Sequence, residues 1–355
     1  MKHLLKITAL TLAFAAIVLA GCEDGKDDNS DSMLLMLLGG GGTATAYKET
    51  YTADGVTFKM AYVPGGKTFP TGINDEGSAT VANAFWIGET EATYELCYKV
   101  FVWATTDAGS GTRADGGVLY TAVFDPVNPP RAGSSGYEAD SQEPVTFLNW
   151  RHAMVWCNAL TEWYNAHKGT GYACVYYTDS GYTTPLRSVN DTGSVNSTPG
   201  SQDNPYVKPD AKGFRLITNN EWELAARYTD VTAWLYGDHV SGDQSGYCHN
   251  DGSPLGGQPL STVFGDYAVF IGNSGASTAA VKSKTANALG LYDMSGNVWE
   301  WCFDWYPGLE GSCRVLRGGG WASEPDNLRV GLAADEGYPY LEAEIIGFRF
   351  ARSAE

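Results

Sequence analysis

The sequence predicts one α+β domain in which ordered loops outweigh regular elements, and three observations favour this class. The chain of 355 residues holds 43 Gly, well above the usual share of about 7%, and Gly permits irregular turns and bulges. Hydrophobic residues make up 43% and aromatic residues 13% of the chain, enough for a large core. Clear helical periodicity stands out at only two places. Disorder is therefore excluded, and the lack of a Gly-X-Y period excludes collagen.

The expected elements follow in chain order. Residues 56–63 alternate apolar and polar side chains before a Pro-Gly-Gly turn, which predicts a strand. Apolar residues at three- and four-residue spacing predict a helix over 149–167, with Gly169 placed to end it. A second helix begins at the capping box 218–221, Thr-Asn-Asn-Glu. The polar, Gly- and Pro-rich stretch 178–211 between them predicts a surface loop.

The start of the chain predicts a targeting segment. Residues 1–21 combine two lysines with a short apolar run, and this run falls short of the ~20 residues that span a bilayer. The run closes with Leu-Ala-Gly-Cys, which resembles the bacterial lipobox. We therefore expect a lipoprotein signal peptide over 1–21 and a diacylglyceryl group on Cys22. A plain secretory signal with a chance Cys is the alternative.

Residues 22–46 predict a lipidated Cys and flexible tether that hold a domain, 47–355, away from a membrane. We expect the lipid anchor alone to bind the bacterial cell envelope, with the domain exposed at the outer membrane surface. The formal net charge of −18 gives no attraction to anionic lipid. The same charge argues against nucleic acid as a partner, because phosphate binding needs Lys and Arg.

Six cysteines remain beside Cys22. An even number in an exported protein permits disulfides, but the spacing shows neither a CxxC pair nor a zinc pattern, so the pairing stays open. They are Cys97, Cys157, Cys174, Cys248, Cys302 and Cys313.

Four ordered motifs carry a family resemblance. They are GFRLIT with EWELAAR in 213–227, NALGLYDMSGNVWEWCFDW in 287–305, RVLRGGGW in 314–321 and GFR in 347–349. Together with an earlier AFWIGETE segment, they make most of the chain resemble the formylglycine-generating-enzyme domain. The resemblance implies a C-type-lectin-like fold with two helices, small antiparallel sheets and extensive ordered loops.

The resemblance also defines the chemistry that is missing. Enzymes of this family use two cysteines shortly after an RGGSW motif to bind copper and oxidise a substrate cysteine. Here no cysteine follows Cys313, which precedes Trp321. The related iron-dependent branch uses several histidines, and the five His of this chain show no ligand spacing. We therefore expect neither catalytic residues nor a catalytic cofactor. An oxidoreductase of the formylglycine-generating type is kept as the alternative.

The resemblance further implies a structural calcium site in the GNVWEW loop. In the family this loop supplies hard oxygen donors, which suit Ca²⁺. The corresponding residues here are Asp293, Gly296, Val298 and Glu300. The alternative is that Asp293 and Glu300 only cap and brace a turn.

Residues 314–350 also resemble the variable region of proteins diversified by retroelements, where adenine-directed mutagenesis rewrites chosen codons within a fixed frame. The frame here is regular, while the residues between its members are chemically mixed. The expected ligand-binding residues are Ala322, Ser323, Glu324, Asp326, Leu332, Ala334, Asp335, Glu336, Gly337, Tyr338, Tyr340, Leu341, Ala343, Glu344 and Ile345.

These observations predict a non-catalytic, surface-displayed lipoprotein that binds a protein or glycan. Tyr338 and Tyr340 would supply rigid contact area, and the carboxylates of the region would favour a cationic patch on the partner. A structural cell-envelope lipoprotein, for which the same region is an ordinary exposed loop, is the remaining alternative.

Overall fold

The chain divides into two units, Met1–Ala44 and Thr45–Glu355, and the computed structural model describes residues of the second. Cys22 and the tether up to residue 45 lie outside the described residues, as does the expected signal peptide. The described residues are 46–109, 111–121, 130–134, 136, 138, 141–190, 192–230, 233–248 and 259–354.

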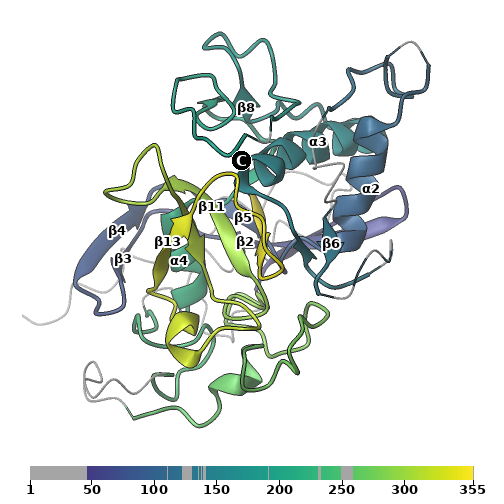
Figure 1. Cartoon of the computed structure of the whole chain (residues 1–355). Coiled ribbons are helices and arrows are strands. Elements are labelled where there is room, and N and C mark those ends of the chain that lie inside the picture. Colours follow the sequence, from purple (N-terminus) through teal and green to yellow (C-terminus); the bar gives the residue numbers. More distant parts are fainter. Residues whose placement is uncertain are drawn as a thin grey trace, which may run out of the picture. The chain divides into compact units, whose positions relative to one another are not determined.

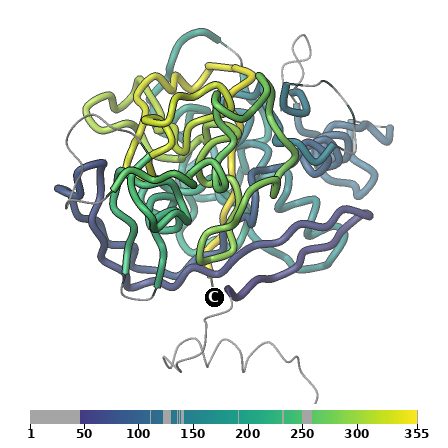
Figure 2. The backbone as a smooth tube through the Cα atoms, turned by 90° about the horizontal axis from the view of Figure 1, so that it is seen from below, coloured from purple at the N-terminus to yellow at the C-terminus, as the bar shows by residue number. Residues whose placement is uncertain are grey.

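A five-stranded antiparallel sheet joins the first and last strands of the domain. Its strands, in spatial order, are β1 (Lys48–Ala53), β2 (Val56–Val63), β5 (Phe85–Gly88), β15 (Phe350–Ser353) and β10 (Phe214–Leu216). β2 is the strand predicted from the alternating pattern. The C-terminal end of the chain therefore runs beside the first strands, at the bottom of Figure 2.

A four-stranded sheet is built mainly from the C-terminal part of the chain. Its strands, in spatial order, are β13 (Ala333–Gly337), β12 (Arg314–Arg317), β11 (Trp299–Trp305) and β14 (Ile346–Phe348). β11 and β14 are parallel, and the other two pairings are antiparallel. β13 lies at one edge of the sheet and faces the viewer in Figure 1. Of the segment expected to vary, only the middle part thus lies in a strand, β13, and loops precede and follow it.

Three two-stranded pairs complete the described strands. They are β3 (Lys67–Thr71) with β4 (Gly77–Val81), β6 (Arg131–Ala132) with β7 (Val145–Thr146), and β8 (Tyr176–Tyr177) with β9 (Tyr206–Val207).

Both predicted helices are present with the expected ends. Helix α3 (Trp150–Lys168) starts at Asn149, whose side chain accepts the His152 N–H, and ends at Gly169 in the left-handed conformation, with φ of 67°. Helix α4 (Asn219–Arg227) starts with the reciprocal hydrogen bonds of the capping box. Local sequence signals therefore set the ends of these helices.

The prediction of only two helices was wrong, because the described residues contain a third. Helix α2 (Tyr94–Thr105) begins at Thr93, whose hydroxyl accepts the Leu96 N–H at 3.3 Å. Its sequence, YELCYKVFVWAT, is rich in β-branched and aromatic residues, which lower intrinsic helix preference. Packing against α3, beside it in Figure 1, supplies the stability that local preference does not.

The stretch 178–211 is an ordered insertion held by a buried arginine. Arg151 on α3 forms an ion pair with Asp203 at 2.6 Å, and both side chains are fully buried. The same guanidinium donates to three carbonyl oxygens of the insertion. The polar composition correctly predicted exposed residues, but the anchoring to α3 was not predicted. In Figure 1 the insertion surrounds the label of β8.

The core fills both faces of the five-stranded sheet. Neighbouring residues of one strand enter different apolar clusters: Met60 and Phe350 belong to the cluster around α3, and Ala61 and Ala351 to the cluster around α4. This alternation follows from the two-residue period of a strand. The sheet is therefore a rigid layer between two helices. No helix of the described residues is long and apolar enough to cross a membrane.

Candidate ligand-binding face

The residues between β12 and β14 form one surface made of three parts. A first loop, 321–332, contains the turn Pro325–Leu328; β13 follows, and a second loop covers 338–345. The indole N–H of Trp321 donates to the carbonyl oxygen of Glu344 at 3.4 Å and so joins the two loops. We call the accessible side chains of residues 321–345 the variable face.

Thirteen of the fifteen predicted ligand-binding residues have accessible side chains. The exposed ones include Tyr338, at 45% of its full accessibility. The exposed residues are Ala322, Glu324, Asp335, Glu336, Tyr338 and Glu344. The partly exposed ones are Asp326, Leu332, Ala334, Tyr340, Leu341, Ala343 and Ile345.

Two predicted ligand-binding residues are corrected, because they belong to the frame. Ser323 is 8% exposed, and its hydroxyl accepts the Gly320 N–H at 2.9 Å. Gly337 is buried, and a Cβ there would lie 2.3 Å from the Arg314 carbonyl oxygen and 2.8 Å from the Trp301 ring. Ser323 closes a turn, and the lack of a side chain at Gly337 lets the backbone of β13 approach that of β12. Sequence spacing alone could not separate such positions from their exposed neighbours.

Buried polar contacts fix the backbone beneath the variable face. Arg317 forms an ion pair with Glu223 at 2.7 Å and donates to the Leu332 carbonyl oxygen at 2.8 Å. Gly319 has a φ of 76°, and a Cβ there would lie 2.7 Å from the Asn327 carbonyl oxygen. The loops are thus held by main-chain contacts and by residues outside the face. Exchange of the outward side chains leaves these contacts intact.

Two tyrosines form an aromatic platform beside the insertion. Tyr338 and Tyr340 stack with ring centroids 5.5 Å apart and planes 19° apart. The guanidinium of Arg151 lies 5.8 Å from the Tyr340 ring. Since Arg151 also anchors the insertion, the platform is supported by the buried ion pair beneath it. Stacked tyrosines offer contact area at little cost in conformational entropy.

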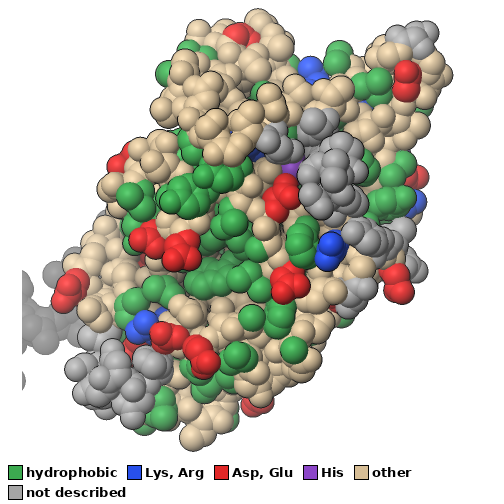
Figure 3. Space-filling view, viewed as in Figure 1, with side chains coloured by type: hydrophobic (Ala, Val, Ile, Leu, Met, Phe, Trp, Pro, Cys, Tyr) green, Lys and Arg blue, Asp and Glu red, His purple; other side chains and the backbone are tan. Residues whose placement is uncertain are grey.

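The variable face is acidic around an apolar centre. Residues 321–345 contain six carboxylates and one arginine, and this Arg329 already donates to the Asp326 carbonyl oxygen at 2.6 Å. Figure 3, in the same view as Figure 1, shows apolar side chains in a hollow at the middle of this side, with carboxylates around it and few cations. Trp321 also contributes partly exposed surface here. The sequence interpretation assigned Trp321 only to the frame. Its place directly before the chemically mixed residues could have indicated that this aromatic side chain is also part of the contact surface.

Glu300 is occupied by protein groups. Its carboxylate accepts the Arg349 Nε and Nη2 hydrogens at 3.0 and 2.7 Å and the Trp222 indole N–H at 2.7 Å. All three side chains are fully buried. A buried carboxylate paired in this way is stabilised by its partners. Glu300 therefore links β11 to α4 and to the strand end at Arg349.

Asp293 lies nearby with one oxygen free of hydrogen bonds. Its Oδ2 accepts the Lys282 N–H at 2.9 Å, whereas its buried Oδ1 has no partner among the described residues. Burial raises the pKa of Asp293 to about 6. Burial and the nearby charges of Asp293 and Glu300 also raise the pKa of Glu91 well above its usual value. The three carboxyl groups thus form an acidic cluster.

The predicted calcium donors do not fit an ion in this arrangement. Asp293 offers an unbonded oxygen, but the Glu300 carboxylate is held by Arg349 and Trp222. In the part of the chain that the structure describes, no group of three or more His, Cys, Asp or Glu side chains is placed to hold a metal. The N–H groups of Gly296 and Val298, which are not the atoms that would bind an ion, fix the loop by bonding to the Gly318 carbonyl oxygen and to Glu91. These contacts match the alternative role, in which the loop is braced by protein groups.

The six described cysteines are buried and unpaired. Burial raises the pKa of every one of these thiols, so they are protonated at neutral pH. Copper binding and redox chemistry need the thiolate. None of these cysteines follows Trp321, the place at which the resemblance puts the family's two copper-binding cysteines.

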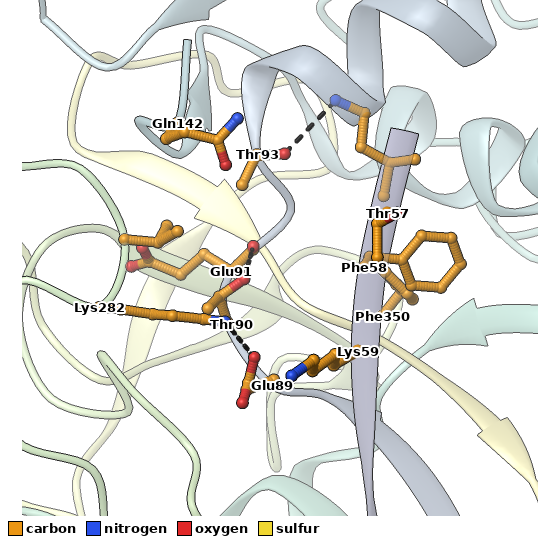
Figure 4. A pocket seen from close by; sticks show the side chains of 13 residues that line it. Thr57, Phe58, Lys59, Glu89, Thr90, Glu91, Thr93, Gln142, Lys282 and Phe350 are labelled. Carbon is orange, nitrogen blue, oxygen red and sulfur yellow. Dashed lines mark hydrogen bonds and ion pairs between the residues drawn. The ribbon is translucent and has the colours of Figure 1, made fainter. Parts of the chain in front are cut away.

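A separate cavity of about 240 Å³ lies between β2, β5 and the start of α2. Figure 4 shows Glu89 at one end, paired with Lys282, and Glu89 also binds Lys48 at 2.5 Å. At the other end, the Thr93 hydroxyl accepts the Leu96 N–H. These groups already have protein partners, and the cavity includes no residue of the variable face. The accessible mixed residues therefore make the variable face the stronger candidate.

The comparisons with known proteins agree with this architecture. A model of the sulfatase-modifying factor enzyme 1-like domain matches residues 48–354. The chain belongs to this family. Chaperone protein LppX of Paenibacillus barcinonensis is 30% identical over 218 residues, which are 57% of this chain and 70% of LppX. The formylglycine-generating enzyme of Streptomyces coelicolor is 32% identical over 164 residues, 40% of this chain and 48% of the enzyme. This family member thus spans about half the length of that enzyme.

Solved structures confirm the fold. Treponema denticola variable protein 1 matches with a TM-score of 0.60 and 29% identity, over 87% of this chain and all of that protein. CarF matches with a TM-score of 0.56 and 25% identity, over 84% of this chain and 99% of CarF. The predicted α+β class and C-type-lectin-like fold are confirmed, with the helix count corrected above. The family member thus shares its scaffold with a variable protein.

Proposed function

We propose that the chain is a non-catalytic lipoprotein that displays a diversified ligand-binding site on its C-type-lectin-like scaffold. The lipid on Cys22 and the tether hold the domain at the bacterial outer surface, and the variable face contacts the ligand. The ligand is a protein or a glycan with a cationic patch, and the lipid anchor is the contact with the membrane. Nucleic acid is not a partner.

One observation carries this proposal. Within 314–350, the regular frame residues other than Trp321, Asn327 and Arg329 are buried, whereas thirteen mixed residues have accessible side chains. A site whose side chains are exchanged needs this separation of support from contact. The likeness to a variable protein supports the same role. The LppX relative, which is called a chaperone protein, favours a protein ligand over a glycan.

The DNA around the coding region tests diversification. We expect a near-copy of the segment encoding 314–350, with adenines at the codons of the thirteen accessible residues, and a reverse-transcriptase gene beside it. The codons of Ser323 and Gly337 should match the frame instead. A locus that contains neither the near-copy nor the reverse-transcriptase gene would favour the alternative of a structural cell-envelope lipoprotein.

Lipidation and display need their own test. Cells fed an alkyne-labelled fatty acid should label the wild-type chain and not a Cys22→Ala variant. Protease added to intact cells should remove the domain while a periplasmic control protein survives. Equal labelling of both chains would overturn the anchor, and protection of the domain would overturn the surface location.

The alternative is a formylglycine-generating oxidoreductase, which the likeness to the Streptomyces coelicolor enzyme favours. A peptide with the Cys-x-Pro-x-Arg motif, incubated with the copper-loaded chain and oxygen, tests it. We expect no aldehyde by mass spectrometry, because the described thiols are protonated and buried. Aldehyde formation that depends on one of these cysteines would establish the enzyme instead.

A further inference from the structure

We infer that the variable face binds an extended, Lys- or Arg-bearing peptide segment that pairs with the free edge of β13. This inference rests on the proposed function and specifies the ligand of the same site. It follows from the position of β13 in its sheet, from a bulge within it, and from the charge around it.

The edge position supplies the backbone contacts. β13 pairs with β12 on one side, and no strand among the described residues pairs with its other side. An edge strand presents unpaired N–H and C=O groups that another chain can complete. Addition of an extended peptide to such an edge is a common mode of recognition.

A bulge turns two acidic side chains outward. Between the pairs Arg314 with Gly337 and Leu316 with Ala334, β13 has one residue more than β12. Such an extra residue re-aims neighbouring side chains. In a regular strand, the neighbouring side chains of Asp335 and Glu336 would point to opposite faces of the sheet. Here both side chains are exposed. The edge therefore carries two adjacent carboxylates.

The negative charge of Asp335 and Glu336 determines which kind of strand can pair with β13. A second copy of this chain would place Asp335 and Glu336 against equally acidic residues, and like charges across a strand pair are destabilising. A segment with Lys or Arg at alternate positions meets complementary charge instead. Directly beyond the strand, Tyr338 and Tyr340 provide an aromatic platform for the end of the peptide. A cationic side chain also gains from a ring face.

The rival explanation is that Asp335, Glu336 and the bulge only shield the edge from other strands. The test uses the full chain in detergent and the peptide Ac-Thr-Lys-Val-Lys-Thr-Lys-Val-NH2, labelled with a fluorophore. One control peptide carries Glu in place of Lys. A second keeps every side chain but is N-methylated at each central residue, which removes the backbone donors without changing the charge.

We expect fluorescence anisotropy to show saturable binding of the Lys peptide. Binding of the N-methylated peptide should be weaker by about tenfold or more, as the loss of one or more hydrogen bonds requires. The Glu peptide should not bind. Equal affinity of the Lys and N-methylated peptides, or no binding of the Lys peptide, would overturn the inference.

Matched variants locate the site. Asp335→Asn with Glu336→Asn should weaken binding of the Lys peptide about tenfold. Asp54→Asn with Asp210→Asn removes the same charge at two exposed positions outside the variable face. Both have positive φ, which Asn tolerates, so this control should bind normally. Equal loss in both double variants would show attraction by net charge alone. Binding of an oligosaccharide array instead of peptides would leave the proposed function standing and overturn this inference.

Discussion

The role of Glu300 decides between a braced loop and a calcium cradle, and Glu300→Gln separates them. The substitution keeps the shape of the side chain but removes the charge that Arg349 and Trp222 contact at 2.7 Å. Loss of one partner from a buried pair costs about 3–5 kcal/mol, because the other charge stays buried and uncompensated. The braced-loop account predicts this loss with and without calcium.

The assay is urea unfolding followed by Trp fluorescence, with calcium chloride and with EDTA. The control is Glu336→Gln, the same chemical change at an exposed position, which we expect to alter the free energy of unfolding by less than about 0.5 kcal/mol. If Glu300→Gln fails to fold, Trp222→Phe removes one hydrogen bond to the same carboxylate and should cost about 1.5–3 kcal/mol. A loss that appears only with calcium would refute the braced loop and establish the ion site.

Three further outcomes follow from the described contacts. Because burial raises the Asp293 pKa to about 6, the folded state holds a proton that the unfolded state releases near pH 4. The contribution of Asp293 to stability should therefore fall as pH rises from about 4 to 6, by on the order of 3 kcal/mol. Asp293→Asn should flatten that slope in denaturant titrations, and an unchanged slope would contradict the assignment. Gly337→Ala should lower the free energy of unfolding by about 1–3 kcal/mol, because the added Cβ meets the Arg314 carbonyl. The control Ala322→Ser should leave the melting temperature unchanged. Equal melting temperatures of the two variants would contradict the assignment of Gly337 to the buried frame. Replacing Tyr338 and Tyr340 by Ala should lower peptide affinity by on the order of 2 kcal/mol and leave circular dichroism unchanged, and undiminished affinity would remove the platform from the site.

Local signals in the sequence predicted the elements whose ends are set locally. The Asn149 cap, Gly169 and the capping box at the start of α4 each act within a few residues, so the pattern identifies them directly. Helix α2 was missed because its aromatic and β-branched residues favour strands. It is helical because α3 packs against it, and such tertiary contacts leave no local signature.

The candidate site divides in the same way. The mixed composition of 321–345 identified the accessible side chains, because exposure tolerates unlike residues. Ser323 and Gly337 were misplaced, because their burial depends on partners that the chain brings together only when folded. Arg151 and Asp203, separated by 52 positions, show why support from the insertion was not predicted.

The central claim is that a bonded frame carries exchangeable side chains. Its most direct test replaces the thirteen predicted ligand-binding residues that have accessible side chains, all at once, with unrelated polar residues and measures the melting temperature by circular dichroism. The account predicts a cooperative transition within a few degrees of wild type, because the Arg317, Gly319 and Gly337 contacts remain. Loss of the transition in most such chains, with Ser323 and Gly337 unchanged, would contradict it.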